Sequence, residues 1–73
     1  MTPSQSRLAT DAYKAAWDIA SKTYDSFANT PDYIVKNHIM IEIVCRMRQG
    51  VKSRRELINC GVRVASTASG QTT

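Results

Sequence analysis

The chain has 73 residues, of which 42% are hydrophobic and 22% charged, with a net charge of +4. A chain of this length forms one small domain, whose core is marginal unless a disulfide, a metal or a second chain reinforces it. One histidine and two cysteines, without metal-ligand spacing, predict neither a structural metal site nor a bound cofactor.

The two cysteines, Cys45 and Cys60, are expected to be free structural thiols, with a disulfide or a reactive thiol as the alternative. The first ten residues, MTPSQSRLAT, lack the apolar core of a secretory signal. The longest apolar segment is interrupted by charged residues such as Lys36 and Glu42, which argues against a membrane span. These features predict a cytoplasmic protein with no membrane contact.

Residues from about 4 to 28 have the period of an amphipathic helix. Alanines follow the middle of its apolar face, and aromatic residues follow one edge: Tyr13, Trp17 and Tyr24. Charges of alternating sign, at spacings of three and four, form a solvated outer face. The aromatic edge is interpreted either as part of the core or as a partly exposed ridge that contacts another protein.

Residues 31–49 are predicted to form a second helix, with Thr30 as its N-cap and Pro31 in its first turn. The short connection predicts that the first two helices form an antiparallel hairpin. A strand over residues 39–44 is the alternative, although no second alternating strand is present to pair with it.

The second helix is apolar over roughly two thirds of its circumference, whereas one neighbouring helix covers only about a third. Self-association of two hairpins into a homodimeric helical bundle would cover the remainder. The predicted dimer interface consists of Ile34, Ile39, Met40, Ile41, Ile43, Val44 and Met47.

Gly50 is expected to end the second helix, and Ser53 to Glu56 match a capping box that begins a third. The third helix is predicted to be short, over residues 54–60, and to end at Gly61. The expected fold is therefore an all-α domain over residues 1–64, made of a helical hairpin and a short third helix. Residues 65–73 are small and polar, which predicts a disordered tail.

The basic charge is concentrated in the C-terminal part of the chain. Up to residue 44 there are four basic and five acidic residues, whereas from residue 45 onward there are six basic residues and one acidic residue. This asymmetry predicts an acidic partner, either nucleic acid or an acidic protein surface. The candidate contact residues are Arg48, Lys52, Arg54 and Arg55, together with the aromatic residues Tyr13, Trp17 and Tyr24.

No enzyme is predicted, because His38 has no candidate nucleophile at a telling spacing and no glycine-rich phosphate loop is present. His38 is expected to be a packed or boundary histidine, and no small-molecule substrate is expected. The predicted function is regulatory: the protein binds another protein, such as a transcription factor or a nucleic-acid-associated machine, and blocks or modulates it. In size and make-up the chain is similar to small inhibitors and anti-activators of phages and mobile elements.

The alternative function is DNA or RNA binding through residues 46–63, in the manner of a helix-turn-helix. A dimer of helical hairpins also resembles, in its shape, the plasmid-encoded RNA-binding proteins of the Rop type. That resemblance implies RNA binding through a Rop-like surface formed by the basic residues 46–63.

Overall fold

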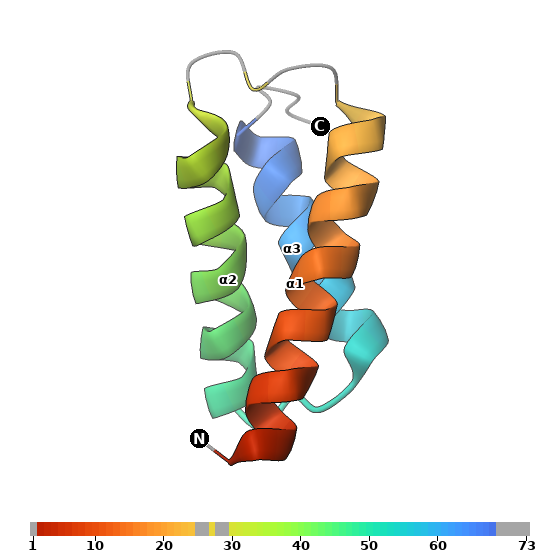
Figure 1. Cartoon of the computed structure of the whole chain (residues 1–73), viewed down its shortest axis with the longest axis vertical. Helices are drawn as coiled ribbons and strands as arrows, with labels where there is room; N and C mark the ends of the chain where they lie inside the picture. The colour runs from red at the N-terminus through yellow and green to blue at the C-terminus, as the bar shows by residue number, and fades with distance from the viewer. Residues whose placement is uncertain (1, 25–26, 28–29, 69–73) are drawn as a thin grey trace.

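The computed structural model describes residues 2–24, 27 and 30–68 of the chain. Three helices make up the fold: α1 (Pro3–Thr23), α2 (Asp32–Arg48) and α3 (Arg54–Ala68). They run along the long axis of the molecule and each contacts the other two, which gives a three-helix bundle (Figure 1). The predicted all-α class and the antiparallel hairpin of the first two helices are confirmed. The alternative of a strand over residues 39–44 is wrong, because this segment lies inside α2.

A reciprocal cap fixes the start of α1. The Thr2 hydroxyl accepts a hydrogen bond from the Gln5 backbone N–H, and the Gln5 side chain accepts one from the Thr2 N–H. Pro3 occupies the first turn, where a missing N–H costs nothing. This T-x-x-Q pattern is visible in the sequence and defines where the first helix begins.

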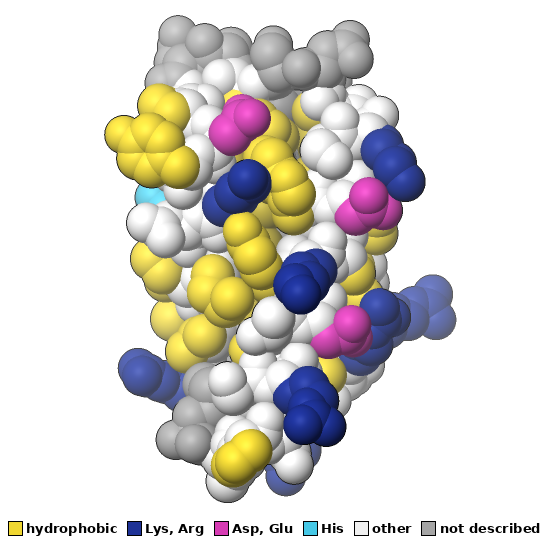
Figure 2. Space-filling view, viewed as in Figure 1, with side chains coloured by type: hydrophobic (Ala, Val, Ile, Leu, Met, Phe, Trp, Pro, Cys, Tyr) yellow, Lys and Arg dark blue, Asp and Glu magenta, His cyan; other side chains and the backbone are white. Residues whose placement is uncertain are grey.

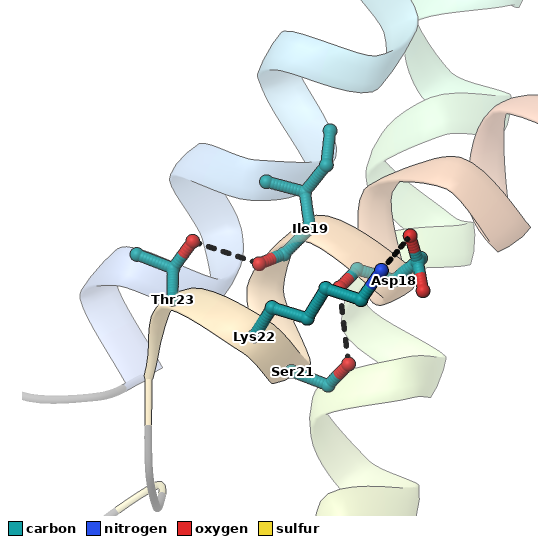
Figure 3. A network of polar contacts seen from close by, with 5 residues as sticks. All are labelled: Asp18, Ile19, Ser21, Lys22 and Thr23. Carbon is teal, nitrogen blue, oxygen red and sulfur yellow. Dashed lines mark hydrogen bonds and ion pairs between the residues drawn. The ribbon is translucent and has the colours of Figure 1, made fainter.

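The first helix ends at Thr23 and not at residue 28 as predicted, because the backbone of Tyr24 is extended (φ −115°, ψ 123°). Polar side chains of the last turn bind within the helix itself (Figure 3). Ser21 and Thr23 donate to backbone carbonyls one turn back, and Lys22 binds the Asp18 carboxylate at 3.2 Å. Serine and threonine hydroxyls that donate hydrogen bonds to backbone carbonyls in this way slightly destabilise a helix. Residues 25–26 and 28–29 of the predicted helix lie outside the described residues.

The second helix begins one residue later than predicted. Pro31, and not Thr30, is the N-cap, and its carbonyl accepts hydrogen bonds from the backbone N–H groups of Ile34 and Val35. Asp32 lies in the first turn, where its negative charge faces the positive end of the helix dipole.

The predicted end of the second helix at Gly50 is confirmed. Gly50 has a positive φ of 100°, a conformation that glycine adopts without steric cost. The Val51 N–H donates to the Arg46 carbonyl at 3.1 Å, and the Gly50 N–H donates to the Met47 carbonyl at 3.0 Å. These two bonds form a Schellman motif, which satisfies carbonyls that the helix end would leave unpaired.

The third helix starts where the capping box predicts it, since the Ser53 hydroxyl accepts a hydrogen bond from the Glu56 N–H. Its predicted end at residue 60 is wrong, because α3 continues through Gly61 to Ala68. Ala65, which the sequence analysis placed in a disordered tail, is fully buried within this helix. Residues 69–73 lie outside the described residues.

Gly61 lies where the three helices meet. A Cβ atom added to it would be 2.7 Å from the Ala16 Cβ of α1 and 3.0 Å from the Ile39 Cγ2 of α2. Such distances are too short for packed carbon atoms, so the glycine is required by the close approach of α3 to its neighbours. Gly61 therefore acts as a packing residue within the helix and does not end it.

The core lies along the axis between the three helices. Alanines supply the buried face of α1, and larger aliphatic residues supply most of the buried volume. The buried hydrophobic side chains are Ala9, Ala12, Ala16, Ala20, Phe27, Val35, Ile39, Ile43, Leu57 and Ala65. Small residues on α1 and α3 let both helices approach the single row of branched side chains on α2.

We predict that Gly61→Ala destabilises the fold. Overpacking of this kind costs about 1–3 kcal/mol, and the better helix propensity of alanine, worth about 1 kcal/mol, offsets only part of it. Urea unfolding followed by circular dichroism measures the loss. Asn59→Ala is the control, because Asn59 is exposed on the same helix. Equal or greater stability of Gly61→Ala relative to this control would contradict the packing role of Gly61.

Candidate binding surfaces

The side of α2 that faces away from the core is largely apolar. We define the outer face of α2 by its residues: Tyr33, Ile34, Asn37, Ile41, Val44, Cys45 and Arg48. Tyr33 is 69% exposed and Ile41 is 57% exposed. Ile34 and Val44 are half-buried but do not pack against the core. An apolar row of this kind on a small monomer marks a candidate interaction surface.

The packing of the bundle explains why this face is uncovered. Val35, Ile39 and Ile43, spaced by four residues, form the buried side of α2 and are fully buried. Both α1 and α3 pack on that side. Because Ile41 lies about 160° around the helix from Ile39 and Ile43, neither neighbouring helix reaches it. No other element of the described chain covers the outer face.

The space-filling view shows hydrophobic side chains along α2 and along its seam with α1 (Figure 2). Lysine and arginine side chains stand beside this band and at the lower end of the molecule (Figure 2). Hydrophobic side chains therefore recur along one long side of the bundle, with polar side chains between them and basic side chains beside them (Figure 2).

The residues of the predicted dimer interface fall into three groups. Ile39 and Ile43 are 0% exposed and belong to the core of the single chain, so their assignment to an intermolecular surface is wrong. Met40 and Met47 are half-buried and pack against the core. Ile34, Ile41 and Val44 remain available to a partner. Ile39 and Ile43 were predicted to face a partner, but they face the core because α3 packs on that side of α2.

The aromatic edge of α1 seals the seam between α1 and α2. Tyr13, Trp17 and Tyr24 are half-buried and pack against the core. Phe27 is buried beside them, with its ring centroid 5.7 Å from that of Trp17 and 6.2 Å from that of Tyr24. The Lys36 Nζ lies 4.9 Å from the Trp17 ring centroid, in a cation–π contact from α2. These contacts favour core packing over the alternative of an exposed ridge that contacts another protein.

The predicted cationic contact residues gather at one end of the bundle. Arg48 ends α2, Lys52 lies in the connection, and Arg54 and Arg55 begin α3; all four are exposed. Arg54 forms an ion pair with Asp11 of α1. Within the described ranges, Arg48, Lys52 and Arg55 have no carboxylate within 4 Å. We call this set of four the basic end.

The thiols and the histidine differ in their surroundings. Burial raises the pKa of the Cys60 thiol, as does the nearby charge of Glu42, and its Sγ donates to the Leu57 carbonyl. Cys45 is exposed on the outer face of α2, and both cysteines are free. His38 is exposed, so of its expected packed or boundary position the packed one is wrong. No cluster of His, Cys, Asp or Glu in the described residues could hold a metal ion.

Comparison with protein-family models, with curated proteins and with solved structures found no match to this chain. None of the helices in the described ranges has the length and apolar character needed to cross a bilayer.

Three residues of the outer face, Tyr33, Asn37 and Cys45, were not among the predicted contact or dimer-interface residues. Asn37 could have been identified from its spacing, because positions 34, 37, 41, 44 and 48 are separated alternately by three and four residues. Such steps keep residues on one side of a helix and are typical of a seam against another helix.

We predict that iodoacetamide alkylates Cys45 several-fold faster than Cys60 in the folded protein near neutral pH. Cys45 is exposed, whereas the raised pKa of Cys60 lowers its thiolate fraction and burial limits access to it. Mass spectrometry of peptides after timed quenching gives both rates. In concentrated urea, which unfolds the protein, the alkylation rates of the two cysteines should become similar. Equal rates in the native protein would contradict the described environment of Cys60.

Proposed function

We propose that this protein is a regulator that acts by binding another protein and catalyses no reaction. The observation that supports the proposal is the outer face of α2, an apolar surface exposed at Tyr33 and Ile41. Removing apolar surface from water is worth about 25 cal/mol per Å², so a partner that covers this face gains free energy.

The chemistry of the face favours a polypeptide helix as its occupant. Ile34, Ile41 and Val44 offer branched aliphatic side chains to a partner, and Arg48 is the one cation in the defined set. A phosphate backbone would instead need cations along the whole length of its contact. A helix with apolar residues at steps of three and four would fit this surface.

The titratable groups of the described residues support the non-catalytic part of the proposal. Asp18 binds Lys22, Glu42 binds Arg46 at 2.9 Å, and Asp11 binds Arg54. These carboxylates form simple ion pairs at the surface. The raised pKa keeps the Cys60 thiol protonated at neutral pH, which makes it a poor nucleophile.

The proposal includes a homodimer. One face of a helix can pack against one other helix at a time. A second copy of the chain and a target protein would therefore exchange on the outer face of α2. Small inhibitors and anti-activators act in a comparable way, because they occupy a surface of a larger protein and block it.

We predict that Ile41→Asp abolishes target binding while the helical content is unchanged, because Ile41 is largely exposed and contributes little to the core. A photo-crosslinking amino acid in place of Tyr33 would report the occupant of the face in the source cell. The expected result is a crosslink to a protein target that is reproduced with the purified pair and lost in Ile41→Asp.

Ile19→Asp is the matched control, because Ile19 is an apolar residue that is 43% exposed on α1, away from the outer face. It should leave the crosslink intact. Equal loss in both variants, or a crosslink to nucleic acid in place of protein, would contradict the proposed function.

Nucleic-acid binding is the second candidate function, and the length of α3 favours it. Because α3 continues past Gly61, it places Arg55, Asn59 and Arg63 at steps of four on one exposed side. Lys52 precedes them at the basic end. The orientation of the helices does not support binding in the manner of a helix-turn-helix, because α2 and α3 lie along each other and do not cross (Figure 1). Contact would instead use the exposed side of α3 against phosphates.

If nucleic acid is the partner, Arg55→Ala should weaken binding and reduce the slope of log affinity against log salt by about one. Fluorescence anisotropy with a labelled duplex and a labelled single strand, over a salt series, measures both quantities. Lys14→Ala is the control, because Lys14 is an exposed cation on α1 outside the basic end. Absence of binding at low salt would exclude this function.

A further inference from the structure

The outer face of α2 has the spacing of a coiled-coil seam. Ile34, Asn37, Ile41, Val44 and Arg48 follow one another at steps of three, four, three and four residues. At ~100° per residue these five positions fall within about 80° of the helix circumference. A seam of this kind packs side chains of one helix between those of a facing helix, so its natural occupant is a helix of similar pattern.

We propose that a second copy of this chain covers the outer face, with its α2 antiparallel to the first. In the register we infer, Ile41 packs against the partner's Val44, and Asn37 lies level with the partner's Arg48. The two-fold axis then passes between residues 42 and 43, so each contact occurs twice. The inference rests on the proposed function, because it names the occupant of the same face.

The residues of the seam match those of a second copy only when the two α2 helices are antiparallel. In the antiparallel register Ile41 and Val44 lie at the centre, Asn37 and Arg48 lie on either side of them, and Ile34 lies beyond Asn37. The side-chain oxygen of Asn37 can accept a hydrogen bond from the guanidinium of the partner's Arg48. The polar residues of the seam are thus paired on either side of the central apolar contact.

A parallel arrangement would oppose like charges. It would place Arg48 against the partner's Arg48 and set the two basic ends side by side, each with Lys52, Arg54 and Arg55. Like charges in direct opposition destabilise an interface. The antiparallel arrangement instead carries each basic end to the opposite end of the dimer.

The size of the molecule also agrees with a contact along one whole side. Stable dimers bury about 800 Å² on each partner. The bundle measures 35 × 22 × 17 Å, so one long side is of comparable area. The seam alone spans about 21 Å, at 1.5 Å per residue from Ile34 to Arg48. The contact must therefore include flanking residues such as Tyr33 and Met40.

The decisive experiment changes the charge of one residue in the seam. Asn37→Asp places a carboxylate level with the partner's Arg48 in the antiparallel register, and sedimentation equilibrium should report a dissociation constant lowered about fivefold. In a parallel register the same change places two carboxylates face to face and raises the constant. Asn59→Asp is the control for net charge, because Asn59 is exposed on α3 and outside the seam.

Tighter dimerisation of Asn37→Asp, relative to both the native chain and Asn59→Asp, would support the inference. Weaker dimerisation, no difference from the Asn59→Asp control, or a native chain that stays monomeric at several hundred micromolar would overturn it. These outcomes are separate from those of the proposed function. A chain that stays monomeric but still crosslinks to a target protein through position 33 would contradict only the homodimer. Tighter dimerisation of Asn37→Asp without any crosslinked target would contradict only the proposed binding of a target protein.

Discussion

The close approach of three helices at Gly61 determines the rest of the molecule. Only a hydrogen atom fits between α3 and the side chains of Ala16 and Ile39 at this point. The alanines on the buried face of α1 allow the same closeness along its length. As a result, α3 packs into the space between α1 and α2, and both neighbours share one row of side chains on α2.

This arrangement leaves α2 with two apolar sides, of which the chain itself uses one. Hydrophobic residues lie nearly all around α2, whereas α1 and α3 are each apolar on one side. The core takes Val35, Ile39 and Ile43, and the opposite side presents Ile41 and Tyr33 to solvent. Helices that are apolar on two sides are typical of the middle of a helical bundle. The function proposed for the protein follows from this unequal use of one helix.

Much of the fold could be predicted from periodicity and helix-ending residues, but the roles of some residues could not. Gly50 and Gly61 have the same side chain, yet one ends a helix at positive φ and the other permits close packing inside one. The sequence does not distinguish these uses, because the second depends on Ala16 and Ile39 from other helices. For the same reason Ile39 was predicted to face a partner, because a third helix that ended at residue 60 would have been too short to bury it. The surplus of apolar surface on residues 31–49 was predicted, whereas the side that stays exposed depends on where α3 packs.

The central claim is that a second copy of this chain covers the outer face of α2 and leaves the core intact. Isotope-filtered NOE spectroscopy on an equal mixture of labelled and unlabelled chains tests it most directly, since it detects only contacts between copies. The account predicts intermolecular contacts from the methyl groups of Ile41 and Val44, and only intramolecular contacts from those of Ile39 and Ile43. Intermolecular contacts at Ile39 and Ile43, or none at Ile41 and Val44 at millimolar concentration, would contradict it.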